Sequence, residues 1–223
     1  LLIFLMFFSV ALPKALMQDS SARYHWTTIL DEGAINRIEE LRRISTLPPV
    51  VARLNYNKVT YFAEETAKNY LSHFGPNFLF LNGGSNYQFS VPGSGLIYPI
   101  LAPFLLLGFW QIYKERKKWQ LVTLVWFLIG PIPASITRDS PHTLRSLLII
   151  PPLIFILSLG LSKFIDLFQS RKPLIKFLTV LILLVSFINF WKNYTGEYVK
   201  NYSWSWQYGY KQAADYIKNY GAD

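Results

Sequence analysis

Four side chains that can carry charge lie within eight consecutive positions, between long runs of apolar residues: Arg138, Asp139, His142 and Arg145. Two guanidinium groups and an imidazole can hold an anion. Arg suits a phosphate because its planar fork donates two parallel hydrogen bonds. The segment therefore predicts an anion site with Arg138, His142 and Arg145 as its donors.

The Ser140-Pro141 pair predicts that a helix begins directly after the first Arg. Ser is a favoured N-cap, and Pro fits the first helical turn. His142 would then lie in the first turn and Arg145 about one turn further on, beside unpaired N–H groups and the positive end of the helix dipole. In the competing interpretation, Asp139 pairs with either Arg and only closes the turn.

The elements that must position these residues are apolar. The chain has 223 residues, is 52% hydrophobic and 17% aromatic, and has a mean hydropathy of +0.23. These values exceed those of an ordinary soluble domain. A transmembrane helix needs about 20 apolar residues to cross a core of about 30 Å. Four stretches approach that length: residues 96–113, 119–136, 144–161 and 173–191.

A fifth apolar run, residues 1–13, is too short to cross a membrane. It could be the core of a signal peptide or the last half of a transmembrane helix in a truncated chain. It has neither an initiator Met nor preceding basic residues, which favours a partial helix over residues 1–16. The expected fold class is therefore all-α: a polytopic membrane protein with four full transmembrane helices plus one partial helix.

Basic residues predict which side each loop faces. "KERKK" at 114–118 and "SRK" at 170–172 belong in the cytoplasm by the positive-inside rule. Residues 17–95 then form an extracytoplasmic loop, the four helices occupy 96–191, and 192–223 begin an extracytoplasmic tail. We expect a multi-pass protein of the cell membrane. Its net charge of +9 partly reflects this topology, and no nucleic-acid partner is expected because no soluble domain carries a basic face.

Several kinds of site are excluded or not indicated by composition. The absence of Cys excludes disulfides, thiolate metal sites and cysteine nucleophiles. The three His have no metal-ligand spacing, and the Gly-rich stretches lack the context of a phosphate loop. We expect no cofactor and no metal site, although the sequence leaves a divalent metal open.

The long outer loop predicts two short helices in irregular chain. Asp31 can cap the first, which would run to about Ser45, with acidic residues early and basic residues late. The second would run from about Lys58 to His73, with an apolar stripe along one side. A loop rich in Gly, Pro and Asn follows. The simplest role for these helices is a cap over the spans.

Three segments resemble the late part of bacterial polytopic glycosyltransferases of the GT-C class. "PASITRDSPHTLRSLLIIPPL" resembles their late spans, and "NKVTYFAEETAKNYLSHFGPNFLFLNGGSN" resembles the preceding outer segment. "WSWQYGYKQAADYIKN" resembles the start of their outer tail. These are the protein mannosyltransferase-like and aminoarabinose-transferase-like enzymes of the glycosyltransferase family 39 group.

The resemblance implies transfer of a sugar from a polyprenyl-phosphate carrier to an acceptor protein or lipid on the extracytoplasmic face. Arg138, His142 and Arg145 would bind the lipid phosphate. In such enzymes the catalytic carboxylate usually lies in the first outer loop, so we expect it upstream of this chain, with sequence missing at both ends. Asp31 and Glu32 lie in a later loop and are not assigned as the base.

Two other functional classes stay open. Prolines in the apolar stretches could break helices, as in transporters, so the protein could be a non-enzymatic transporter or a lipid-flippase-like protein. Against this, no predicted span carries a charge near its centre, which transport pathways usually have. An envelope scaffold would need only the outer loop.

Overall fold

The computed structural model describes residues 27–220, and all the regular secondary structure in that range is helical. This confirms the all-α fold class for the described part of the chain. One isolated antiparallel bridge joins Thr28 to Thr137. The expected partial transmembrane helix, residues 1–16, lies outside the described residues.

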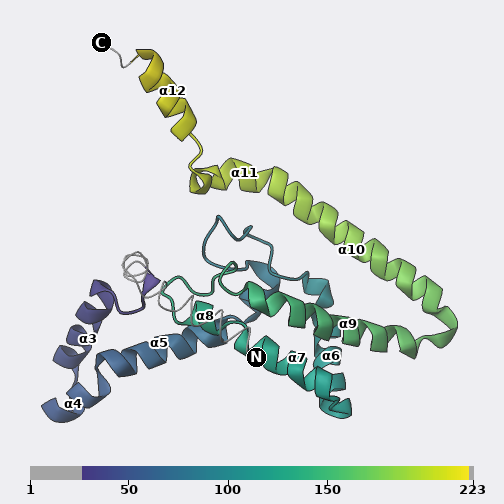
Figure 1. Cartoon of the computed structure of the whole chain (residues 1–223), viewed down its shortest axis with the longest axis horizontal. Helices are drawn as coiled ribbons and strands as arrows, with labels where there is room; N and C mark the ends of the chain where they lie inside the picture. The colour runs from purple at the N-terminus through teal and green to yellow at the C-terminus, as the bar shows by residue number, and fades with distance from the viewer. Residues whose placement is uncertain (1–26, 221–223) are drawn as a thin grey trace, which may run out of the picture.

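The first three helices form an arm that extends to one side of the molecule (Figure 1). They are α3 (Glu32–Ile44), α4 (Pro49–Asn55) and α5 (Lys58–Ser72). The two predicted helices of the outer loop are thus confirmed. Asp31 caps α3 by accepting a hydrogen bond from the Ala34 N–H at 2.9 Å. The helix α4 was not expected; it begins at Pro49, after α3 has ended at Ile44, because Pro fits the first helical position.

The remaining chain alternates short irregular helices with longer α-helices. The irregular ones are η1 (Asn77–Leu81), η2 (Pro99–Leu101), η3 (Leu147–Ile149), η4 (Gln169–Arg171) and η5 (Ser203–Trp206). The α-helices are α6 (Ala102–Glu115), α7 (Lys118–Ile129), α8 (Ile132–Ser135), α9 (Ile150–Leu167), α10 (Lys172–Thr195), α11 (Glu197–Tyr202) and α12 (Tyr210–Tyr220).

The core lies where α6, α7 and α9 meet, with η1 inserted at one end. Helices α6 and α9 touch through glycines: a Cβ added at Gly108 would overlap the Ile156 carbonyl, and one added at Gly160 would overlap the Phe104 carbonyl. Small residues at such an interface let two backbones approach closely. The buried apolar cluster joins these four elements and η3: Phe78, Leu79, Leu105, Ile112, Phe127, Ile149, Leu153 and Ile156.

Two segments are long and apolar enough to cross a membrane by length and composition. They are Leu147–Leu167, with 21 residues, and Gln169–Trp206, with 38 residues. Four spans were expected, but α6 and α7 have 14 and 12 residues, which is short of a bilayer core of about 30 Å. The chain is irregular before Pro99, and α7 ends at Gly130-Pro131, because Pro cannot continue the hydrogen-bonding of the helix before it.

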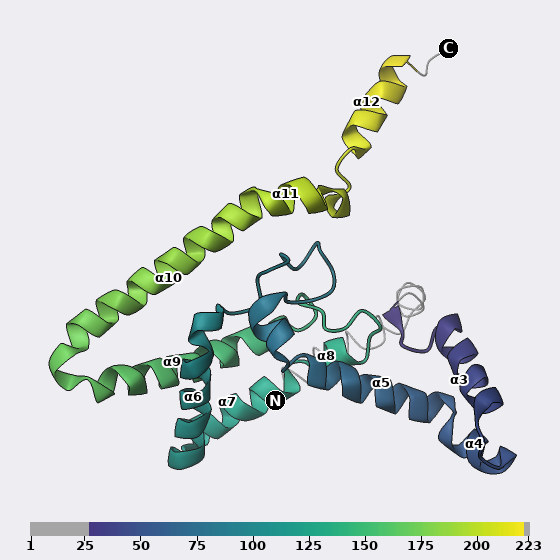
Figure 2. The ribbon, with the colours of Figure 1, turned by 180° about the vertical axis from the view of Figure 1, so that it is seen from behind.

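The two basic turns lie apart in both views (Figures 1 and 2). One turn joins α6 to α7 and the other joins α9 to α10. The loop at 82–95 and helix α11 lie at the opposite end of α10. Helix α10 has no buried residue along its 24 positions. Exposed apolar side chains lie along the helix from Leu174 to Tyr194.

Candidate functional site

The predicted helix start at Pro141 is wrong. Residues 141–146 form turns, and helical structure begins only at η3, so His142 and Arg145 precede the helix. The Pro141 carbonyl, which a helix would use for its own backbone, accepts a hydrogen bond from the Ser85 N–H at 3.2 Å. The Gly84 N–H donates to the Thr143 hydroxyl at 3.1 Å. These contacts with the loop at 82–95 hold the segment out of the helix, so His142 and Arg145 do not lie in a first helical turn.

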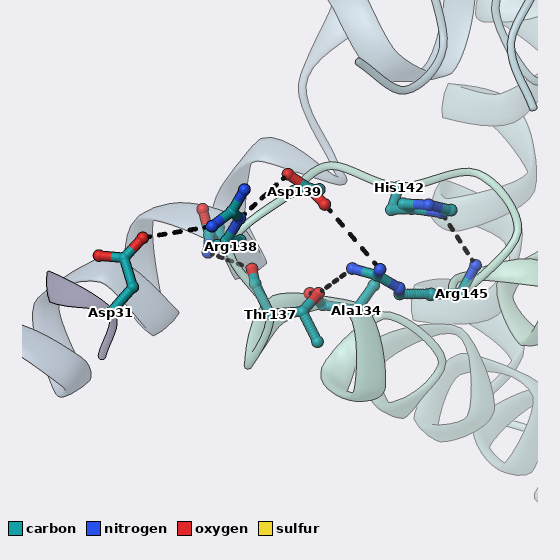
Figure 3. Close-up of polar contacts among 8 residues, drawn as sticks. Asp31, Ala134, Thr137, Arg138, Asp139, His142 and Arg145 are labelled. Atoms are coloured by element: carbon teal, nitrogen blue, oxygen red, sulfur yellow. Dashed lines mark hydrogen bonds and ion pairs between the residues drawn. The ribbon is translucent and has the colours of Figure 1, made fainter. Parts of the chain in front are cut away.

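The structure does bring the two Arg side chains together, around Asp139 (Figure 3). Arg138 Nε lies 3.7 Å from one Asp139 carboxylate oxygen, and Arg145 Nη2 lies 4.0 Å from the other. Arg145 Nη1 also donates to the Thr137 hydroxyl at 2.9 Å. The two guanidinium groups thus flank one carboxylate on a loop of eight residues.

A second carboxylate reaches this loop from α3. Arg138 Nη1 lies 3.4 Å from Asp31 Oδ2, while Asp31 Oδ1 caps α3. The Asp31 carboxylate therefore has structural partners on both oxygens, and it is not placed as a free base. Glu32 lies in the first turn of α3.

The ion pairs of this loop are long and open to water. The side chains of Arg138 and Asp139 are each 47% exposed, and that of Arg145 is 27% exposed. Exposed pairs of this kind contribute only about 0–1 kcal/mol. Two positive and two negative groups also cancel in formal charge. The turn-closing interpretation thus matches the contacts seen, yet the pairs are weak enough for a phosphate to compete with Asp139.

His142 is placed in the interior of the loop and not at its surface. It is 3% exposed, its ring lies 5.3 Å from that of Phe89, and its Nδ1 accepts from the Arg145 N–H at 3.4 Å. Burial lowers the pKa of His142, the positive charge of Arg145 lowers it further, and Asp139 opposes this by raising it. A neutral, buried imidazole orients the Arg145 backbone. It does not present a charge to a ligand.

Helix α5 contacts the loop at 137–145 through two residues that no motif in the sequence marks. Asn69 Nδ2 donates to the carbonyls of Ser135 and Thr137, at 3.2 and 3.1 Å. The Asn69 carbonyl accepts from His73 Nδ1 at 2.7 Å. His73 is fully buried, and burial lowers its pKa. The only signal in the sequence was that both residues lie on one face of a predicted amphipathic helix, which usually means packing.

Two cavities lie between α10 and the parts of the chain that face it. One, of about 460 Å³, is lined by apolar side chains of α6, α9 and α10, including Phe104, Phe164 and Leu183. The other, of about 590 Å³, lies toward the C-terminal end of α10, where Ser94, Asn189 and Asn193 add polar groups. The space beside α10 thus changes from apolar to partly polar along the helix.

Over residues 27–220, no group of three or more His, Asp or Glu side chains is arranged to hold a metal ion. No protein family, curated protein or solved structure matches the chain. Inference about function therefore rests on the chain's own residues.

Proposed function

We propose that the protein is a multi-pass membrane glycosyltransferase that moves a sugar from a polyprenyl-phosphate carrier to an acceptor protein or lipid on the extracytoplasmic face. The observation that carries this proposal is the loop at 137–145, where two partly exposed Arg side chains flank a single Asp. Arg pairs are suited to a phosphate because each guanidinium can donate two parallel hydrogen bonds.

The apolar cavity beside α10 supports a lipid-linked substrate. It is lined by α6, α9 and α10, and nearly all of its lining is hydrocarbon or aromatic. A prenyl chain gains free energy by leaving water for such surroundings. The polar groups near the outer end of α10 lie on the side where the carrier phosphate would be.

The proposed topology has four spans. Helix η2 continues into α6 over residues 99–115, and α7 continues toward α8 over residues 118–135. Each combined segment is close to the lower limit of about 17 residues for a span. Helices α9 and α10 supply the other two, and the basic turns face the cytoplasm.

In the proposed reaction, the acceptor attacks the anomeric carbon of the sugar and the bond to the carrier phosphate breaks. Negative charge builds on the departing phosphate, and Arg138 and Arg145 stabilise it. His142 acts through Arg145 as a positioning residue. The acceptor's proton goes to a carboxylate base, a role not assigned to Asp31 because Asp31 caps α3 and pairs with Arg138.

The test compares a short polyprenyl phosphate with the matching polyprenol, which lacks the phosphate. Native mass spectrometry of the protein in nanodiscs should show about tenfold stronger retention of the phosphate. Equal retention of the two lipids would contradict a phosphate site.

A second measurement separates the enzyme from a flippase-like protein. The complete protein, with the upstream segment expected to carry the catalytic carboxylate, should release free polyprenyl phosphate from a polyprenyl-phosphate sugar when acceptor membranes are present, if it is a glycosyltransferase. A flippase moves the intact carrier between leaflets without release. Movement without release would therefore favour the rival class.

A further inference from the structure

A third cavity, of about 320 Å³, lies where the outer loop meets the tail. Three separate parts of the chain form it: the segment from η1 through the loop at 82–92, the turn at Pro141, and α11. Its volume falls at the lower end of the range of about 300–1,000 Å³ for small-molecule sites. The side chains that give it chemical character are Asn77, Asn82, Ser85, Tyr87, Pro141 and Tyr202.

The aromatic side of this cavity is held in place by a column of rings. Tyr202 stacks on Tyr198, with centroids 5.8 Å apart and planes at 24°, and it packs against Tyr87 at 4.6 Å. Trp204 meets Tyr87 edge to face at 5.9 Å. The Tyr198 hydroxyl donates to the Tyr87 carbonyl, which ties α11 to the loop. The rings are therefore fixed before any ligand arrives.

The opposite side of the cavity consists of amides and backbone. Asn82 Nδ2 donates to Asn77 Oδ1 at 2.6 Å, and Asn82 Oδ1 accepts from the Gly93 N–H at 3.1 Å. Each amide offers two donors and two lone pairs, so both retain hydrogen-bonding capacity after these contacts. Gly84 lies so close to Pro141 that a Cβ atom at position 84 would overlap the Pro141 carbonyl oxygen. This side of the cavity therefore requires a glycine.

None of the nine described residues that line this cavity carries a charge. A pyranose ring matches the combination seen, because its C–H face packs on an aromatic ring through dispersion. Its hydroxyls meanwhile require donors and acceptors. An ammonium or a carboxylate on the sugar would lose water without gaining an opposite charge.

We propose that this cavity, the Asn77–Tyr202 pocket, binds the ring of an uncharged sugar and discriminates against amino sugars and uronic acids. The inference rests on the proposed function for the source of that sugar. Pro141 belongs to the pocket and directly precedes His142, while Arg138 lies three residues earlier. At most about 11 Å of extended chain therefore separates the pocket from the first phosphate-binding Arg.

The experiment uses three methyl glycosides that share one ring but differ in charge: methyl glucoside, methyl glucosaminide and methyl glucuronide. Saturation-transfer NMR measures their binding to the full chain in nanodiscs, which avoids sugar-based detergents. The neutral glucoside should bind at least about tenfold more tightly than either charged analogue. Equal binding of all three, or no binding of the glucoside, would overturn the proposal.

Variants locate the binding. Tyr202→Ala and Asn77→Ala should each weaken glucoside binding about tenfold, and Tyr202→Phe should retain most of it because the ring face remains. The matched controls are Tyr208→Ala, whose side chain is 73% exposed, and Asn219→Ala on exposed α12. Thermal unfolding identifies any variant that fails to fold; if Tyr202→Ala does, Asn77→Ala compared with Asn219→Ala carries the test. Equal losses in the pocket and control variants would place the sugar elsewhere.

Different variants test the phosphate site and the sugar pocket, so the two proposals can be refuted independently. Arg145→Ala should abolish selective retention of polyprenyl phosphate while leaving glucoside binding unchanged, and Tyr202→Ala should do the reverse. Glucoside binding without phosphate retention would refute the transferase site and leave the pocket intact. Phosphate retention with no glucoside binding would refute only the pocket.

Discussion

Arg145 is the residue at which the phosphate-binding and turn-closing interpretations differ most. Arg145→Ala should weaken binding of polyprenyl phosphate about 10- to 100-fold, because a hydrogen bond to a charged partner contributes about 1.5–3 kcal/mol. Arg145→Lys should recover only part of this loss, since Lys keeps the charge but lacks the planar fork. Retention by native mass spectrometry, corrected for the folded fraction, measures the effect.

Asp139→Ala is the matched comparison. If Arg145 binds phosphate, removing the competing carboxylate 4.0 Å away should leave binding unchanged or tighten it. Both substitutions should change stability little, because these ion pairs are largely exposed. Equal stability losses in Arg145→Ala and Asp139→Ala, with unchanged binding per folded molecule, would favour the turn-closing role.

The two buried histidines predict a pH dependence of stability. Burial lowers the pKa of both His73 and His142 below the unfolded value of about 6.5. Below about pH 6.5 the unfolded chain therefore binds more protons than the folded chain. The free energy of unfolding should fall as the pH drops further, and their contribution is complete above that value.

Thermal unfolding at pH 7.5 and 5.5 measures this dependence. The double variant His73→Gln/His142→Gln should show a smaller shift in midpoint between the two pH values than the parent. Lys68→Ala, an exposed change on the same α5 helix, should keep the parent's shift. An unchanged shift in the double variant would assign the pH dependence to other groups.

At the scale of single residues, the sequence predicted that Arg138, Asp139 and Arg145 meet, but not that Asp31 pairs with Arg138 or that His142 is buried. The clustering of Arg138, Asp139 and Arg145 follows from their spacing alone. The support from Asn69 could not be predicted, because it depends on α5 reaching carbonyls 66 and 68 positions away. An Asn on a helix face has no local feature that distinguishes such a contact from exposure to water.

At the scale of elements, predictions succeeded where local capping chemistry decides the structure. Asp31 caps α3, and Asn57 and Thr60 form a capping box at α5, so both helices begin where the sequence indicates. The helix expected from Pro141 failed because Ser85, far away in sequence, takes the Pro141 carbonyl. A tertiary contact thus prevented the helix that the Ser140-Pro141 pair predicts.

The glycine contact between α6 and α9 gives a direct test of the bundle. Gly160→Ala should destabilise the protein by about 1–3 kcal/mol, because the new methyl group would overlap the Phe104 carbonyl and force the helices apart. Ser158→Ala, at an exposed position two residues earlier on α9, should have little effect. Thermal unfolding in nanodiscs compares the two, and equal midpoints would show that the helices are not this close.

At the scale of the whole molecule, hydropathy predicted four membrane spans, but only two helical segments are long enough to cross a membrane. Apolar composition marks residues 96–113 and 119–136 as membrane segments, but it says nothing about where Pro99 and Pro131 divide them. In the proposed alternating topology, both basic turns face the cytoplasm. Sidedness is therefore the property on which the proposed function depends most.

Because the chain contains no Cys, single cysteines provide clean labelling sites for the sidedness. Ser85→Cys in the outer loop and Ser170→Cys in the turn before α10 both replace exposed residues. Ser140 would be a poorer choice, since its hydroxyl is buried. An impermeant thiol reagent should modify Ser85→Cys in intact cells and Ser170→Cys only after lysis, because "SRK" should remain in the cytoplasm. Labelling of Ser170→Cys from outside would invert the topology, and Arg138 and Arg145 would then face the wrong side of the membrane for an extracytoplasmic transferase.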